Sequence, residues 1–103
     1  MINDKNSLIK VLEQELPFLQ KEYGVERIGL FGSFVRDTVT PESDVDLVIE
    51  FNKPIGFGFF RLSYYLEEKL ERKVDIISPL GLQKMRIKKI ADSINNELEY
   101  FQA

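Results

Sequence analysis

The residues best suited to chemistry are three aspartates in segments that the hydrophobic pattern predicts to be strands. Asp44 and Asp46 are separated by one residue, and Asp75 lies in the apolar stretch 74–77. Residues two apart on a strand project from the same face with Cα atoms ~6.6 Å apart, so the first two carboxylates should lie together. Neighbouring carboxylates repel each other unless a cation neutralises them. The pattern therefore indicates a metal site with Asp44, Asp46 and Asp75 as its ligands.

The composition narrows the identity of that metal. The chain contains no cysteine and no histidine, which excludes disulfides, thiolate sites and imidazole ligands. Carboxylates are then the metal ligands that remain, and hard oxygen ligands favour Mg²⁺, with Mn²⁺ as the alternative. The absence of histidine also removes the commonest general base, so proton transfer would fall to a carboxylate.

Each aspartate also has an ordinary structural interpretation. Asp44 and Asp46 fit a surface pair on a half-exposed strand, although aspartate is disfavoured within strands. Asp75 fits a salt bridge to Arg72, Lys73 or another basic residue, because a carboxylate in a buried strand is costly unless it is paired or metal-bound. The residues alone leave both interpretations open.

A second candidate is the dipeptide Gly32-Ser33, which follows a predicted strand and is separated from Asp44 by ten residues. A glycine at a strand end lets backbone N–H groups approach a phosphate, and the serine hydroxyl adds a donor. The ordinary interpretation is a strand-to-helix turn. The Gly-x-x-x-x-Gly-Lys pattern of a P-loop is absent. The dipeptide is therefore a candidate phosphate site of another kind.

The hydrophobic pattern predicts the elements that must position these residues. Apolar spacings of three and four predict helices, and alternation predicts strands. The predicted elements are helices over 4–23, 34–36, 59–71 and 82–95, strands over 25–31, 44–51 and 74–78, and an extended tail over 98–101. Pro17 predicts a kink or a fresh first turn in the first helix. The predicted fold class is α/β (α+β), a small sheet covered by helices.

Size and charge limit the class of protein. With 103 residues, 44% of them hydrophobic and 30% charged, the chain is expected to form one domain over residues 1–103. A formal net charge of −3 gives no broad basic surface for nucleic acid. No apolar run approaches the ~20 residues that span a bilayer, and no secretory signal is visible. A cytoplasmic protein is expected.

Two further stretches have less specific interpretations. The segment 56–60, rich in glycine and phenylalanine, lacks the spacing of a dinucleotide fingerprint. It predicts a loop that feeds aromatic residues into the core, with Phe57 in a partner-binding patch as the alternative. The basic residues between Lys84 and Lys89 predict the solvated face of the last helix. The alternative interpretation is that these basic residues contact an acidic partner or the triphosphate tail of a nucleotide.

Together, these motifs resemble the nucleotidyltransferase family related to DNA polymerase β. The segments that carry the resemblance are 30–36, 43–51 and 72–77. The closer likeness is to the minimal members of that family, the antitoxins that pair with HEPN-domain toxins, and it spans roughly 23–94. The resemblance implies a polymerase β-like fold with a small mixed sheet of three to four strands flanked by helices.

The resemblance also implies roles for individual residues. Asp44 and Asp46 would hold two Mg²⁺ ions, and Asp75 would complete the catalytic site and take a proton from the acceptor hydroxyl. Gly32 and Ser33 would then bind the phosphates of ATP or another nucleoside triphosphate. The remaining nucleotide-binding residue would be Arg36, which would balance the negative charge of the triphosphate. Its ordinary interpretation is a surface residue paired with Asp37 or Glu42.

The implied activity is transfer of AMP from ATP to a hydroxyl, a tyrosine by family resemblance, of a HEPN-type toxin. The alternative is a non-catalytic, nucleotide-binding antitoxin that neutralises its toxin by contact alone. Asp37 departs from the family pattern, because a glycine commonly follows the motif arginine, and an extra acid near a triphosphate would weaken binding. The length leaves no room for an acceptor-binding domain, so we expect a separate chain to supply the acceptor, within a homo- or hetero-oligomer.

Overall fold

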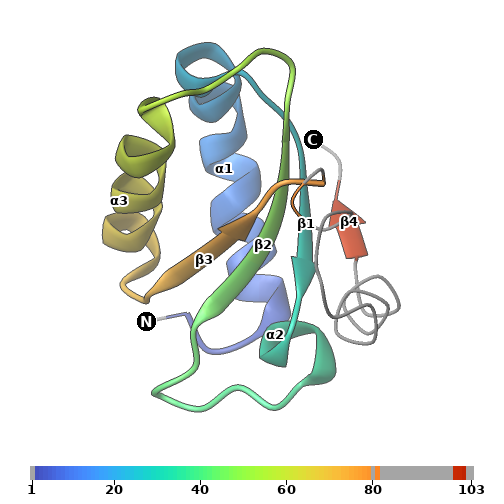
Figure 1. Cartoon of the computed structure of the whole chain (residues 1–103). Helices are drawn as coiled ribbons and strands as arrows, with labels where there is room; N and C mark the ends of the chain where they lie inside the picture. Colours follow the sequence, from blue (N-terminus) through green and yellow to red (C-terminus); the bar gives the residue numbers. More distant parts are fainter. Residues whose placement is uncertain (1, 80, 82–98, 102–103) are drawn as a thin grey trace.

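A computed structural model of the chain describes residues 2–79, 81 and 99–101. In this part of the chain, four strands form one sheet in the order β3-β2-β1-β4, and two long helices cover one of its faces (Figure 1). The sheet is mixed, because β1 pairs antiparallel with β2 and β4 while β2 pairs parallel with β3. The predicted α/β class with a small mixed sheet is confirmed.

Helix α1 (Lys5–Tyr23) begins and ends as its sequence predicts. The Asp4 side chain accepts a hydrogen bond from the backbone N–H of Ser7 at 2.8 Å, which caps the first turn. Gly24 ends the helix in the left-handed conformation with φ 70°. A single helix passes through Pro17, so the predicted fresh first turn does not form.

The strands are β1 (Val25–Phe31), β2 (Val45–Phe51), β3 (Val74–Ile77) and β4 (Glu99–Phe101). Successive side chains of a strand point to opposite faces of the sheet. The helix-facing residues of β2 are fully buried, as the predicted alternation requires: Val45, Leu47 and Ile49. The observed strand β2 is one residue shorter than the strand predicted over 44–51, because Asp44 lies before it.

The core lies between this face of the sheet and the two long helices, α1 and α3 (Gly58–Leu70). Both helices present leucines spaced three or four residues apart, which is the periodicity of one helix face. The buried leucines are Leu8, Leu12, Leu16 and Leu19 of α1 with Leu62, Leu66 and Leu70 of α3. Among the described residues, no helix is long and apolar enough to cross a membrane.

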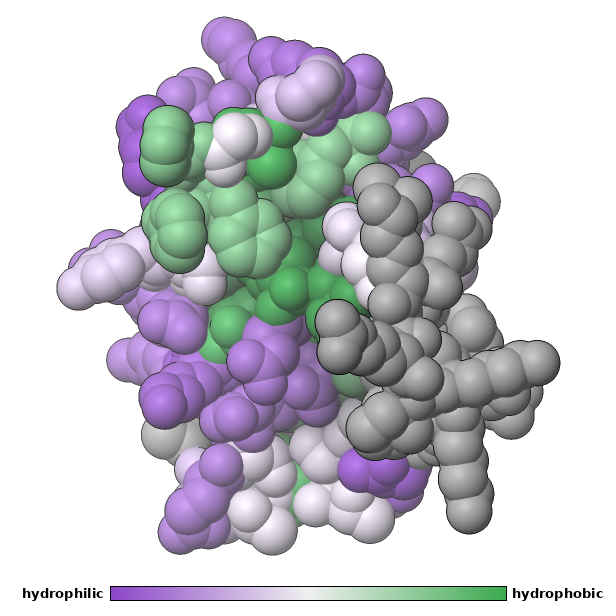
Figure 2. Space-filling model, viewed as in Figure 1, coloured by the Kyte–Doolittle hydropathy of each residue, from purple (hydrophilic) through white to green (hydrophobic). Residues whose placement is uncertain are grey.

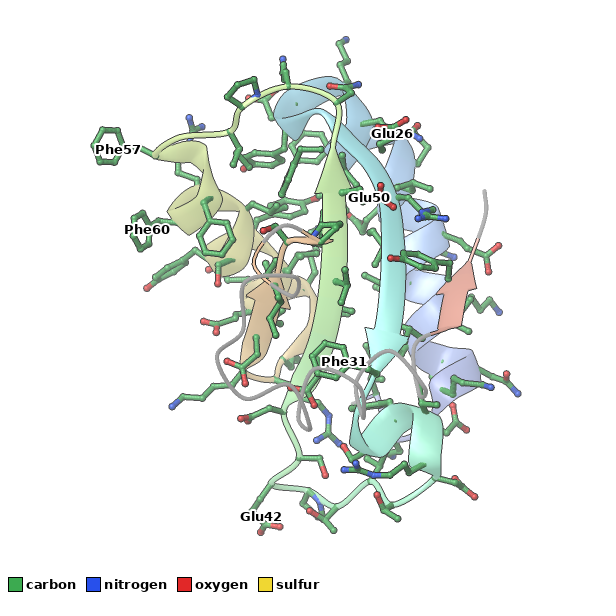
Figure 3. All side chains as sticks on the ribbon, turned by 45° about the vertical axis from the view of Figure 1, so that its right-hand side comes forward. Glu26, Phe31, Glu42, Glu50, Phe57 and Phe60 are labelled. Carbon is green, nitrogen blue, oxygen red and sulfur yellow. The ribbon has the colours of Figure 1, made fainter. Side chains whose placement is uncertain are left out.

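The aromatic segment 56–60 differs from its prediction. Phe59 is partly buried, but Phe57 is 90% exposed and Phe60 is 70% exposed. Both project away from the core at the start of α3 (Figure 3), and Tyr64 on the next turn is also exposed. The expectation that this loop feeds its aromatic residues into the core is wrong for Phe57 and Phe60. The space-filling view shows apolar side chains gathered over α3 and the neighbouring end of the sheet (Figure 2).

Two predicted features lie outside the described residues. One is the helix over 82–95, and the other is the basic cluster between Lys84 and Lys89. The predicted extended tail is confirmed where the structure describes it, because β4 pairs with β1 through Gly29 and Tyr100.

Candidate active site

Three candidate residues meet at one edge of the sheet because of how the strands pair. β1 runs antiparallel to β2, so Phe31, its last residue, pairs with Asp46 near the start of β2. β3 runs parallel to β2, so Asp75 near its start pairs with the same Asp46. Neighbouring strands lie about 4.8 Å apart. The topology thus places Gly32, Asp46 and Asp75 in or beside one row across the sheet.

The two strand aspartates share the face of the sheet opposite α1 and α3. Val45 and Val74 point into the core, and the alternation of each strand turns Asp46 and Asp75 to the opposite face. Asp46 is half-buried and Asp75 is exposed. Phe31 lies in this row toward the α2 end of the sheet, whereas Glu50 lies toward the other end (Figure 3). Asp46 and Asp75 therefore share one face of the sheet, whereas the common face predicted from the sequence concerned Asp44 and Asp46.

Asp44 is positioned by a turn and not by a strand. The turn over 40–43 is closed by the backbone N–H of Thr40, which donates to Ser43 Oγ at 2.8 Å. The first ladder bond after it runs from the N–H of Val45 to the carbonyl of Lys73, at 2.8 Å. Asp44 is exposed between these two fixed points. Asp44 lies one residue before β2, so its predicted common face with Asp46 stays a prediction.

Gly32 occupies a backbone conformation that glycine alone adopts readily, with φ 80° and ψ −150°. A Cβ atom at this position would lie 2.2 Å from Asp46 Oδ2 and 3.0 Å from its Cγ. Any side chain at position 32 would therefore collide with the Asp46 carboxylate. The glycine lets a main-chain turn and a carboxylate occupy adjacent space, which is an arrangement suited to a metal–phosphate group.

The short helix α2 (Ser33–Arg36) follows directly. The carbonyl of Gly32 accepts hydrogen bonds from the N–H groups of Val35 and Arg36, both at 3.1 Å, which starts the helical turn. Ser33 is half-buried at its first position, and Arg36 is exposed in its last turn. Ser33 thus lies next to the row of aspartates, while the structure leaves the nucleotide-binding role of Arg36 a prediction.

The ordinary interpretation of Asp75 as a buried ion pair does not describe this structure. Asp75 is exposed, so the burial that would demand a partner is absent. Arg72 is buried and donates to the backbone carbonyls of Ile2, Thr40 and Ser43. Within the described ranges, the side chains of Asp44 and Asp75 make no hydrogen bond or ion pair with a protein group. Sequence reasoning considered Arg72 only as an ion-pair partner and missed these contacts, which no local pattern signals.

The donor atoms of the candidate site are of the chemical type that a hard divalent cation prefers. Carboxylates, a serine hydroxyl and the space that a Cβ at Gly32 would fill suit Mg²⁺ in chemical type. Within residues 2–79, 81 and 99–101, however, no three acidic side chains lie close enough together to hold a metal ion as they stand. Asp46 and Asp75 are neighbours in register, and the complete three-aspartate site remains a prediction.

A hollow of about 500 Å³ lies away from the aspartates. It is lined by apolar residues at the far end of β2 and β3 and the start of α3: Phe51, Ile55, Phe59, Ile76 and Ile77. Because β2 and β3 are parallel, this end is opposite the end that carries Asp46 and Asp75. The hollow was not predicted from the sequence, since its lining comes from three separate segments.

The sequence matches the nucleotidyltransferase domain family over residues 9–103. A protein of Methanocaldococcus jannaschii, named as a candidate protein adenylyltransferase, is 36% identical over 94 residues, which cover 88% of this chain and 91% of the relative. The protein adenylyltransferase MntA of Thermococcus cleftensis is 35% identical over 83 residues, which cover 80% of each chain. The chain therefore belongs to the nucleotidyltransferase domain family, which confirms the family predicted from its motifs.

Solved structures give the same fold. The structure of a candidate minimal nucleotidyltransferase superposes with a TM-score of 0.70 at 25% identity and covers 97% of this chain and 96% of its own. A chain in the structure of a tri-AMPylated Shewanella oneidensis HEPN toxin in complex with an MNT antitoxin gives a TM-score of 0.53 at 18% identity. That match covers 93% of this chain and 66% of the other. At this identity the second likeness concerns the fold alone.

Proposed function

We propose that this chain transfers AMP from ATP to a hydroxyl, a tyrosine, of a separate HEPN-type toxin and thereby acts as its antitoxin. The observation that carries the proposal is the row that joins Gly32, Asp46 and Asp75 at one edge of the sheet. The names of the relatives and of the toxin–antitoxin structure support the substrate class and the partner. The proposal places the chain in the cytoplasm, where ATP is available.

The residues divide the reaction between them. Asp44, Asp46 and Asp75 would hold two Mg²⁺ ions, and the polypeptide from Gly32 to Ser33 would bind the triphosphate beside them, with Arg36 balancing its charge. Bound Mg²⁺ supplies positive charge to the α-phosphate and to the leaving oxygen. The acceptor oxygen bonds to the α-phosphorus, the bond to the β-phosphate oxygen breaks, and pyrophosphate leaves. Asp75 takes the proton of the acceptor hydroxyl, since the chain has no histidine.

A second candidate function is an antitoxin that neutralises its toxin by contact, with vestigial nucleotide binding. The observation that favours it is the lack of a three-acid cluster in the part of the chain that the structure describes. The exposed aromatic residues Phe57, Phe60 and Tyr64 also give the chain a surface for contact. The two functions differ in whether the aspartates matter for protection against the toxin.

Label transfer distinguishes the two functions. Wild type and Asp44→Ala/Asp46→Ala are incubated with a HEPN-type toxin from the same organism, Mg²⁺ and α-labelled ATP, and the toxin is weighed by mass spectrometry. We expect a mass increase of one AMP with wild type and none with the double variant, because catalysis by a metal acts on the transition state. The complex with the toxin should survive in both.

Glu50→Gln is the matched control. Glu50 lies on β2 on the same face as Asp46, four residues away, or about 13 Å along the strand, and it pairs with Arg27. This variant should transfer AMP as wild type does. Full protection of cells by the double variant, together with an unmodified toxin under wild type, would establish the contact-only function instead.

A further inference from the structure

Arg72 is a buried cation whose partners are backbone carbonyls. Its side chain is 7% exposed, and within the described residues it forms no ion pair. Nε donates to the carbonyl of Ile2 at 2.9 Å, and Nη1 donates to the carbonyls of Thr40 at 3.0 Å and Ser43 at 2.7 Å. Its Nη2 is buried without a hydrogen-bond partner in the structure. A buried arginine is costly, so its retention calls for a physical reason.

The contacts of Arg72 join the chain segments that carry the candidate site. The two carbonyls bound by Nη1 belong to the turn over 40–43 that ends immediately before Asp44. The guanidinium carbon lies 5.3 Å from the ring centre of Phe34, the residue after Ser33. Arg72 itself is three residues before Asp75. One side chain thus contacts or adjoins all three segments.

The shape of the guanidinium accounts for this choice of residue. Its planar fork presents donors in several fixed directions, so it can bond two carbonyls of one turn and a third carbonyl of the N-terminal segment together. A lysine ammonium keeps the charge but lacks the fork. A methionine fills a similar volume and leaves all three carbonyls without this donor. Of these three side chains, only arginine can bond both carbonyls of the turn and the carbonyl of Ile2 at once.

We propose that Arg72 is a positioning residue that holds the turn carrying Asp44 in place relative to Gly32-Ser33 and Asp75. It acts through that turn and touches no substrate. Fixing the turn before a cation binds lowers the ordering cost that binding would otherwise carry. Arg72 therefore raises the affinity of the aspartates for a divalent cation. This inference rests on the metal site of the proposed function.

The test compares Arg72→Met and Arg72→Lys with Arg27→Met, in the full chain. Arg27 is the matched control, because it is an arginine on β1 whose partners, Glu50 and the ring of Tyr100, lie outside the candidate site. Free Mn²⁺ is titrated by electron paramagnetic resonance without nucleotide. Amide exchange is followed at Ser43 and Val45, whose N–H groups donate to the carbonyls of Thr40 and Lys73. Thermal unfolding of each variant separates loss of the turn from loss of the fold.

We expect Arg72→Met to weaken Mn²⁺ binding by about 10-fold or more, as for residues that orient metal ligands, and to speed exchange at Ser43 and Val45. Arg72→Lys should fall between Arg72→Met and wild type, and Arg27→Met should match wild type. If Arg72→Met does not fold, Arg72→Lys carries the comparison. Wild-type exchange at Ser43 and Val45 in the folded variants would overturn the proposal, as would unchanged Mn²⁺ affinity. A wild type that binds Mn²⁺ without transferring AMP would refute the proposed function and leave this test intact.

Discussion

Replacing Gly32 with alanine tests the coupling between the glycine and the Asp46 carboxylate. With φ 80° and ψ −150°, Gly32 is in a region where other residues cost about 1–3 kcal/mol. The new methyl would also lie 2.2 Å from Asp46 Oδ2, so the carboxylate must leave its present rotamer. An off-rotamer side chain costs about 0.5–1.5 kcal/mol. We therefore expect Gly32→Ala to lower the free energy of unfolding by about 1.5–4.5 kcal/mol.

Gly56→Ala is the matched control for this variant. Gly56 also has a positive φ, 57°, but a Cβ atom there would meet nothing within 4 Å. The left-handed conformation alone should cost about 1–2 kcal/mol. Urea unfolding followed by circular dichroism measures both variants against wild type. The difference between the two losses in free energy of unfolding then measures two effects at position 32 together: the collision with Asp46 and the more restricted backbone region.

A double-mutant cycle separates these two contributions. In an Asp46→Ala background the carboxylate is gone, so Gly32→Ala should cost less by about 0.5–1.5 kcal/mol, which is the rotamer contribution. If Gly32→Ala costs no more than Gly56→Ala, or if its cost is the same with and without the Asp46 carboxylate, the coupling inferred from the structure is refuted.

Four further predictions concern the scaffold. Asp4→Ala should lower the melting temperature because it removes the cap on the Ser7 N–H. That hydrogen bond holds the pKa of Asp4 below its ordinary value of 3.8, so wild type should lose the stability from this cap as the pH falls below 3.8. Asp4→Asn cannot be protonated in this way and should not show that loss. The hydrogen bond from the Tyr65 hydroxyl to Glu15 raises the pKa of Tyr65 to about 12, and its stabilising effect should be lost as pH rises through that value. Absorbance at high pH measures this titration, and Glu15→Gln should lower the pKa. Phe57→Ser should change the free energy of unfolding by less than about 0.5 kcal/mol in urea, because Phe57 is 90% exposed. Phe34→Ala, at a position 2% exposed, should cost about 3–5 kcal/mol.

The part of the site that depends on strand alternation could be predicted from the sequence. Val45 and Leu47 read as core residues, and that assignment alone turns Asp46 to the opposite face. The position of the Gly32 turn next to Asp46 depends on the antiparallel register of β1 and β2, which the motif spacing suggested only through the family resemblance. Once the register is known, the convergence follows from geometry.

The predictions that were wrong concern contacts between segments that are distant in the sequence. Asp75 reads as buried because its neighbours are apolar, yet its face of β3 is exposed. Arg72 reads as its ion-pair partner because the two are close in sequence, whereas the guanidinium bonds carbonyls 29 to 70 residues away. Backbone carbonyls are present at every residue, so a sequence contains no sign of which ones a buried arginine will bond.

Asp37 illustrates how the structure changes the meaning of a departure from a family pattern. It ends α2 with φ 61° and ψ 39°, in the left-handed region that favours glycine. Aspartate tolerates this region better than most residues, so the backbone requirement explains a glycine here and also an aspartate in its place. Its neighbours along a shallow hollow are Asp4, Lys5 and Asn6 at the start of α1. A glycine preference at this position therefore reflects the turn after α2, and repulsion of a triphosphate is not needed to explain it.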